Sequence, residues 1–307
     1  MISSKKYLIY LAVLIIGFDF ILGSLLEKLY FSDKSKKNDP QIYSILGTNE
    51  EMLIFGSSRA VHHYNPIIFE RELKMTSYNV GSGGQNIYYH LAVLESTITR
   101  YKPKLVLFEL MNIDFEETSE VWDTEKLGVL LPFYNKSVGA QRAVLRRGDS
   151  EKIKTLSKIY PFNSLIYEII RNNYYPFNNS IKGYIPINKT WGVQIESEKG
   201  KDNIYDENKI SALHNFIELC QTNEIQLVIC ISPIFKRVNG FDKYEKIVNE
   251  LMNNYNIKVL DHLQDTSFIN HNFYFSDPVH LNSKGAEYYS YVLTSQIKDV
   301  LSDSLTK

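Results

Sequence analysis

Two serines follow a glycine where an apolar run ends, in the segment IFGSSRAVHHYNP at residues 54–66. A serine hydroxyl becomes a strong nucleophile when a neighbouring imidazole accepts its proton. A candidate imidazole stands far along the chain, in SDPVHLNSKGA, where Asp277 precedes His280 by three residues. A carboxylate can fix the imidazole tautomer and stabilise the imidazolium. Ser57 or Ser58, with His280 and Asp277, therefore forms a candidate site for acyl transfer.

Acyl transfer also needs hydrogen-bond donors aimed at the oxyanion of the tetrahedral intermediate. Two further segments contain residues of the right kind. The glycines of NVGSGGQN, at 79–86, free backbone N–H groups to donate, and MNID, at 111–114, contains an asparagine. Each segment follows an apolar run, as the serines do, so these three groups of residues share one position relative to the predicted strands.

From residue 51 onward, short apolar runs alternate with segments of helical periodicity, which predicts a parallel sheet with helices on both faces. Ligands bind such sheets beyond the carboxyl ends of the strands, where the candidate residues fall. The predicted strands are 52–56, 77–81, 104–111, 225–233 and 257–261. The predicted helices are 87–101, 210–220, 241–255 and one from about 284 to 300, with Asn282 or Ser283 as its cap.

The alternation breaks between about 113 and 205, where helical stretches are separated by loops rich in Asn, Pro and Gly. We interpret this segment as an insertion in the 51–301 domain, acting as a lid or a substrate-binding cap. Residues 27–50 are polar and rich in lysine, which predicts a tether.

The N-terminal segment, residues 1–26, is predicted to anchor the chain in a membrane. Its apolar run from 7 to 26 has Asp19 as its only charge, and a helix of that length spans about 30 Å, the thickness of a hydrocarbon core. Lys5 and Lys6 favour an orientation with the N-terminus inside and the domain outside the cytoplasm. A cleaved signal peptide is the alternative, although no A-x-A-like site follows. Asp19 would mark a helix partner or be tolerated near the end of the span.

Composition argues against several other classes of protein. The net charge is −1 and no long basic run occurs, which argues against nucleic acid as the partner. Cys220 and Cys230 fall in apolar patterns and are predicted to be buried free thiols. His62 and His63 have no Cys, Asp or Glu at the spacing of metal ligands, so no metal site is predicted there. No cofactor is implied.

The order of these motifs resembles the SGNH (GDSL-like) hydrolase superfamily. The shared elements are G-x-S, then N-x-G-x-x-G, then an Asn after the third strand, and finally D-x-x-H-L-N-x-x-G, together covering most of 51–301. The resemblance implies a flavodoxin-like three-layer α/β/α fold. GSSR in place of Gly-Asp-Ser, with a membrane anchor, looks like the branch met in cell-envelope polysaccharide O-acetylation and teichoic-acid D-alanylation.

Carried over by position, the resemblance makes Ser58 the nucleophile and pairs Asp277 with His280 as the base. Gly84 and Asn112 would donate to the oxyanion beside the Ser58 N–H. The chain departs from the family at ELMN, where bulkier residues replace the Gly before Asn, so Asp114 is an alternative to Asn112 as the residue facing the site.

Each candidate also has a plain structural interpretation. Ser58 could be a helix cap, Gly84 a turn residue, Asn112 a cap that ends a strand, and His280 a surface histidine. Arg59 would contact an anionic group of the substrate or form a salt bridge.

The sequence thus predicts a membrane-anchored serine esterase that removes acyl groups, most simply acetyl, from a cell-surface glycan through an acyl-enzyme. The expected partners are the acylated glycan, the membrane and proteins of envelope polysaccharide assembly. An O-acyltransferase would use the same residues, with a sugar hydroxyl in place of water. A catalytically silent glycan-binding or scaffold protein of the same fold is the third hypothesis.

Overall fold

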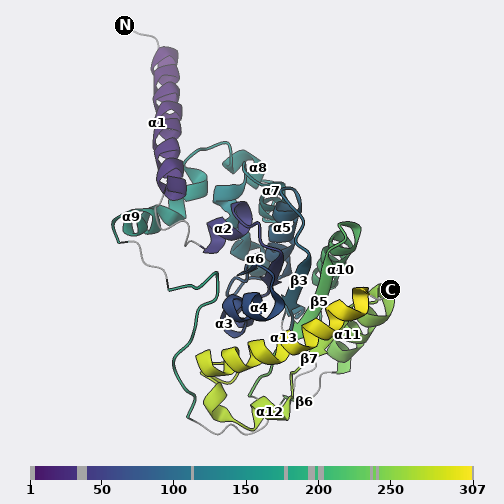
Figure 1. Ribbon diagram of the computed structural model, residues 1–307. Coiled ribbons are helices and arrows are strands. Elements are labelled where there is room, and N and C mark those ends of the chain that lie inside the picture. Colours follow the sequence, from purple (N-terminus) through teal and green to yellow (C-terminus); the bar gives the residue numbers. More distant parts are fainter. Residues whose placement is uncertain are drawn as a thin grey trace.

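A five-stranded parallel sheet forms the centre of the computed structural model, which describes residues 4–32, 40–111, 114–175, 179–192, 198–199, 204–235, 238–239 and 242–305 (Figure 1). The strands lie in the order β2-β1-β3-β5-β7. Their bounds are β1 Met52–Phe55, β2 Ser77–Asn79, β3 Leu105–Glu109, β5 Gln226–Ile231 and β7 Lys258–Asp261. Counted along the chain this order is 2-1-3-4-5, the flavodoxin-like order, and the predicted α/β fold class is confirmed.

Alternate residues of each strand point to opposite sides of the sheet, and helices cover both sides. In β3, Val106 and Phe108 belong to one apolar cluster, whereas Leu105 and Leu107 belong to the other. Continuous apolar runs such as LVLF therefore supply two cores at once, and the result is a three-layer arrangement.

One helical layer packs on the Val106 side of the sheet, and its helices are α5 Ile87–Ile98, α10 Glu207–Thr222 and α11 Asp242–Tyr255. The other layer contains α3 Ser58–His63, α4 Pro66–Leu73, α12 Thr266–Ile269 and α13 Ser283–Leu305, preceded by the 3₁₀ helix η5 Asn272–Tyr274. A short pair, β4 Glu198–Lys199 and β6 Val238–Asn239, lies outside the main sheet.

The segment between β3 and α10 is largely helical and contributes to the core. Gly139 allows α7, Val138–Leu145, to approach α5 closely, because a Cβ there would lie 2.2 Å from the Ala92 carbonyl oxygen. The neighbouring η3, Lys126–Phe133, adds buried leucines to the same cluster. The elements are α6 Glu120–Glu125, η3 Lys126–Phe133, α7 Val138–Leu145, α8 Glu151–Lys154, η4 Tyr160–Leu165 and α9 Ile166–Tyr174.

After α9 the chain returns along the sheet, and we call residues 181–191 the strap. Its Lys182 carbonyl accepts from the Asn79 N–H at 2.9 Å, and its Ile185 N–H donates to the Val61 carbonyl at 3.0 Å. Gly183 has a φ of +84° and lies so close to β2 that a Cβ would be 1.8 Å from the Asn79 carbonyl oxygen. The strap therefore joins β2 to α3, beside the predicted site.

The N-terminal helix α1, Ser4–Ser32, projects from the body of the molecule (Figure 1). The helix is long and apolar enough to cross a membrane, but a signal sequence would have the same length and composition. The orientation of α1 stays a prediction. The helix continues into the predicted tether at 27–50. Within that segment, α2 Pro40–Leu46 packs against α5 with Ile45 buried, so part of the segment belongs to the folded domain.

Candidate active site

Ser58 lies on a tight turn between β1 and α3. Gly56 has a φ of +135°, and a Cβ there would lie 2.7 Å from the Glu109 carbonyl oxygen, so the turn requires glycine. Ser57 occupies the cap position of α3 without a side-chain capping bond, and Ser58 is the first helical residue. The interpretation of Ser58 as a helix cap therefore does not describe its place in the structure.

The structure brings Ser58, His280 and Asp277 into one line of hydrogen bonds. Ser58 Oγ lies 2.8 Å from His280 Nε2, and His280 Nδ1 lies 2.9 Å from the nearer Asp277 carboxylate oxygen. With Nδ1 donating to the carboxylate, Nε2 is left to accept the serine proton. Sequence positions more than two hundred residues apart thus meet at the carboxyl edge of the sheet.

The hydrogen bonds around Asp277 favour the ionised form of its carboxyl group. Burial raises the pKa of its carboxyl group, but hydrogen bonds from the Val279 N–H and from His280 outweigh burial and leave the pKa below its ordinary value. The Val279 and His280 N–H groups both donate to one carboxylate oxygen at 2.9 Å. An ionised Asp277 can therefore orient the imidazole and stabilise its protonated form.

Asn282 fixes the loop that carries this pair. Its side-chain oxygen accepts from the Gly285 N–H at 3.0 Å, capping α13, while its amide nitrogen donates to the Phe273 carbonyl at 2.7 Å. The Ser276 N–H donates to the His280 carbonyl at 2.9 Å and closes the turn. Of the two predicted caps for this helix, the structure shows Asn282 in the capping role.

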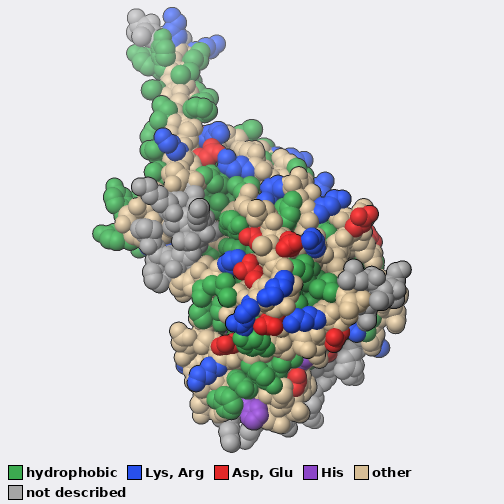
Figure 2. All heavy atoms as spheres, viewed as in Figure 1, with side chains coloured by type: hydrophobic (Ala, Val, Ile, Leu, Met, Phe, Trp, Pro, Cys, Tyr) green, Lys and Arg blue, Asp and Glu red, His purple; other side chains and the backbone are tan. Residues whose placement is uncertain are grey.

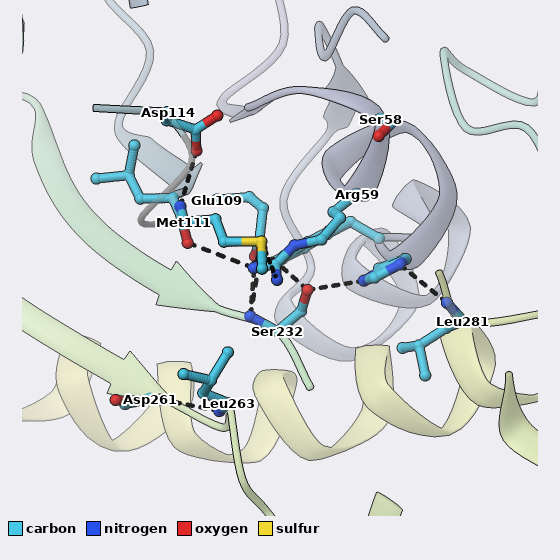
Figure 3. A network of polar contacts seen from close by, with 12 residues as sticks. Ser58, Arg59, Glu109, Met111, Asp114, Ser232, Asp261, Leu263 and Leu281 are labelled. Carbon is cyan, nitrogen blue, oxygen red and sulfur yellow. Dashed lines mark hydrogen bonds and ion pairs between the residues drawn. The ribbon is translucent and has the colours of Figure 1, made fainter. Parts of the chain in front are cut away.

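A buried carboxylate, Glu109, lies beneath the line of hydrogen bonds at the end of β3. Its side chain is 2% exposed and pairs with the Arg59 guanidinium, also buried, while the Tyr64 hydroxyl donates to it from α3's C-terminal side. From the loop after β5, Ser232 donates through both its N–H and its hydroxyl, the latter at 2.9 Å (Figure 3). Glu109 therefore joins three segments of the chain.

His63 connects this cluster to the loop of His280. Its Nε2 accepts from the Leu281 N–H at 2.9 Å, so Nδ1 carries the proton and donates to Ser232 Oγ at 2.7 Å. Burial holds the pKa of His63 well below its ordinary value, which keeps the ring neutral as these bonds require. The residue after His280 is thus hydrogen-bonded, through His63 and Ser232, to Glu109.

Arg59 takes the position that the salt-bridge interpretation describes. Its guanidinium contacts Glu109, the Leu110 carbonyl and the Met111 sulfur, and its side chain is buried away from the surface (Figure 3). The predicted substrate contact is therefore replaced by a structural ion pair, because a buried guanidinium faces the protein interior.

The glycine turn after β2 lies over Ser58. A Cβ at Gly83 would lie 3.8 Å from the Ser58 Cβ, whereas the position of Gly84, with a φ of +73°, faces open space. Asn79 holds the turn by accepting from the Gly81 N–H at 3.0 Å. Asn112 lies outside the described residues.

Asp114, the alternative to Asn112, closes the loop after β3. Its carboxylate accepts from the Met111 N–H at 2.7 Å, and it borders a small cavity with Ser57, His90 and Glu109. Burial raises the pKa of Asp114 to about 6. The carboxyl group thus lies beside Ser57 and holds its own loop.

His62 flanks the imidazole of His280. The two rings meet edge to face with centroids 5.6 Å apart, and His62 Nδ1 donates to the Ile185 carbonyl of the strap at 2.7 Å. Burial lowers the pKa of His62, so its ring is neutral near neutral pH. Within the described residues, no three His, Cys, Asp or Glu side chains gather as metal ligands would.

Such an arrangement can activate a serine hydroxyl. The His280 ring accepts the proton as Ser58 Oγ attacks a carbonyl carbon, and Asp277 stabilises the charged ring. The turn at 83–84 lies next to Ser58, with a Cβ at Gly83 placed 3.8 Å from the Ser58 Cβ. The protonated His280 ring can then give the proton to a leaving alcohol.

Comparisons with known proteins give weak likenesses. No protein-family model and no curated protein matches the sequence. Among solved structures, a candidate acylhydrolase from Bacteroides fragilis aligns over 83% of this chain and 89% of its own, with a TM-score of 0.42 and 13% identity. An acetyl xylan esterase aligns over 80% and 99%, with a TM-score of 0.41 and 13% identity. A GDSL-like lipase from Bacteroides thetaiotaomicron aligns over 82% and 88%, with a TM-score of 0.40 and 12% identity.

The sequence predicted Ser58, Asp277 and His280 as site residues but not the cluster that supports them. Glu109 is the one charge in the apolar run LVLFEL, and a buried charge needs a partner, which was an available signal. His63 and Ser232 carry no such signal, because neither spacing nor composition shows that their loops meet.

We predict that Glu109→Gln destabilises the protein by about 3–5 kcal/mol, because it leaves the buried Arg59 guanidinium without a counter-charge. The matched control is Glu72→Gln, which removes the exposed pair with Lys298 and should leave the melting temperature nearly unchanged. Thermal unfolding of the full chain measures both. Equal melting temperatures for the two variants would contradict a central role for Glu109.

We predict that Asp114 makes stability depend on pH. Its pKa is 3.8 in the unfolded chain and about 6 in the fold, so the free energy of unfolding falls as pH rises through this range. Asp114→Asn should remove that dependence and raise the urea midpoint at pH 7 relative to wild type, but not at pH 3. Asp149→Asn, at an exposed position, is the control, and a wild-type-like pH profile for Asp114→Asn would refute the prediction.

Proposed function

We propose that this protein is a serine esterase of the SGNH (GDSL-like) type that acts through an acyl-enzyme. The observation that carries the proposal is the line from Ser58 Oγ through the His280 ring to Asp277, with separations of 2.8 and 2.9 Å. The flavodoxin-like strand order and the position of all three residues at the carboxyl edge of the sheet also support it.

In the proposed reaction, Ser58 Oγ attacks the ester carbonyl while its proton passes to His280 Nε2. The Ser58 and Gly84 N–H groups and the Asn112 side chain would donate to the oxyanion. Collapse of the tetrahedral intermediate breaks the bond to the alkoxide, which takes the proton from His280. Water then attacks the acyl-enzyme with the same ring as base, releasing the acid and free Ser58.

The proposed substrate is an acyl ester, most simply acetyl, on a cell-surface or exported glycan. The apolar helix α1 supports a location at a membrane, and the motif pattern resembles the polysaccharide-modifying branch of the superfamily. In that location the domain would lie outside the cytoplasm, where envelope polysaccharides and their assembly proteins are found.

We predict that the full chain in detergent hydrolyses p-nitrophenyl acetate and that Ser58→Ala lowers kcat about 10⁴-fold or more, because the nucleophile is lost. Ser57→Ala is the matched control and should retain activity, since its side chain makes no capping bond. Covalent labelling by a fluorophosphonate should follow the same pattern. A wild type with neither turnover nor labelling at Ser58 would refute the proposal.

The acyl acceptor is tested in the same assay. Release of free acetate from an acetylated oligosaccharide supports an esterase, whereas transfer to an added unacetylated oligosaccharide assigns the acyl-enzyme to an acyltransferase.

We predict that Asn112→Ala lowers kcat about 10²–10³-fold with little change in KM, as expected for a donor that contacts the oxyanion in the transition state. Asp114→Asn should leave kcat within a few-fold of wild type, because Asp114 closes its own loop. Steady-state kinetics on p-nitrophenyl acetate distinguish the two. The reverse pattern would assign the oxyanion contact to Asp114.

A further inference from the structure

The domain holds α1 well before the apolar run of that helix ends. The Asp19 carboxylate accepts from the Lys158 N–H at 2.7 Å and from the Ile159 N–H at 3.3 Å, and Ser157 donates its hydroxyl. Gly23 lies against the backbone of Lys158, where a Cβ would come within 2.3 Å of its carbonyl carbon. One face of the second half of α1 is thus packed against the domain.

This docking leaves too little free helix to cross a bilayer. The part of α1 beyond the docked region, residues 5–18, is about 21 Å long at 1.5 Å per residue, whereas a hydrocarbon core is about 30 Å thick. A span of ordinary length must include residues down to about 26. If α1 crosses the membrane, the parts of the domain packed around residues 19–26 then reach the bilayer.

The exposed side of the docked half of α1 is apolar, as a lipid contact requires. Leu22 and Leu26 face Phe162 and Ile169 of the domain, but Phe20 and Ile21 on the other side are 59% and 71% exposed. On α9 and just before η4, the domain presents a further set of exposed apolar side chains, which we call the collar: Leu156, Ile166, Tyr167, Ile170 and Tyr174.

The collar lies mainly on α9, which packs against α1 (Figure 1). Figure 2 shows apolar side chains along α1 and again over α9. Isolated apolar residues are normal on a protein surface, whereas larger exposed apolar patches mark protein or membrane interaction sites. Lys152 on α8 and Arg171 on α9 are exposed basic residues close to the collar in the sequence.

We propose that the collar is embedded in the outer part of the bilayer, so that the domain rests on the membrane surface instead of hanging from a flexible anchor. An interfacial amphipathic helix sinks about 5–10 Å into the headgroup and acyl boundary, which matches the roughly 9 Å that α1 lacks. Tyrosines suit this depth because their rings are amphipathic. The buried face of α9, with Ile169, stays on the protein.

The test uses the full chain reconstituted into vesicles of phosphatidylethanolamine and phosphatidylglycerol, with a fluorescent NBD label on one introduced cysteine. Cys220 and Cys230 are buried, so the introduced thiol reacts selectively. The collar variants are Tyr167→Cys and Ile170→Cys. Leu14→Cys, on the free part of α1, is the membrane-embedded reference, and Met252→Cys, exposed on α11, is the aqueous reference.

Lipids with brominated acyl chains should remove about half or more of the collar fluorescence, as for Leu14→Cys, because the label lies within the acyl boundary. Iodide should quench only the Met252→Cys label. Collar labels that behave like Met252→Cys would overturn the proposal and leave the collar to a protein partner. A Leu14 label that lipid does not quench would overturn it too, since α1 would not span.

A second test keeps the label at one position, Leu156→Cys, and changes residue 170 of the collar. Ile170→Glu places a charge in the collar and should abolish lipid quenching of a Leu156→Cys label, whereas Ile170→Leu should retain it. Unchanged quenching in Ile170→Glu would refute the embedded position. Hydrolysis of p-nitrophenyl acetate, measured in parallel, reports on the proposed esterase independently of these results.

Discussion

The buried Glu109 carboxylate is the constraint on which the site depends. It ends the central strand β3 and accepts hydrogen bonds from α3, through Arg59 and Tyr64, and from the loop after β5, through Ser232. A buried ion pair contributes little net stability when its partners are compared with apolar residues of the same shape, but it tolerates few alternative arrangements. Its effect is to fix three loops at one edge of the sheet.

Contacts with the cluster around Glu109 fix the positions of Ser58 and His280. Ser58 precedes Arg59 on α3, so the ion pair that holds Arg59 also holds the first turn of the helix. The Leu281 N–H, next to His280, is bound by His63, whose ring is fixed in turn by Ser232. A separation of 2.8 Å between Ser58 Oγ and His280 Nε2 is thus supported from both sides.

The sequence predicted the parts of this arrangement that depend on local pattern. Apolar runs such as LVLFE defined the strands, and D-x-x-H with its following Asn located the base, because these residues form one turn and one helix cap. The pairing of Ser58 with His280 came from motif order. His63 and Ser232 could not be predicted, since their roles arise where loops from distant strands meet. Asn112 lies outside the described residues, and its role stays a prediction.

The inserted segment between β3 and α10 was interpreted as a lid or cap, and the structure shows it linking two distant parts of the molecule. Near its middle, Lys158 and α9 hold α1. Further on, the strap contacts His62, beside the imidazole of His280, and its Ile187 carbonyl accepts from Ser283 at the start of α13. Because one stretch of chain binds both the apolar helix and the flank of the site, the orientation of Ser58 relative to α1 is set by packing. An anchor on a flexible tether would leave that orientation free, whereas the proposed membrane-anchored esterase would meet its substrate from a defined side of the membrane surface.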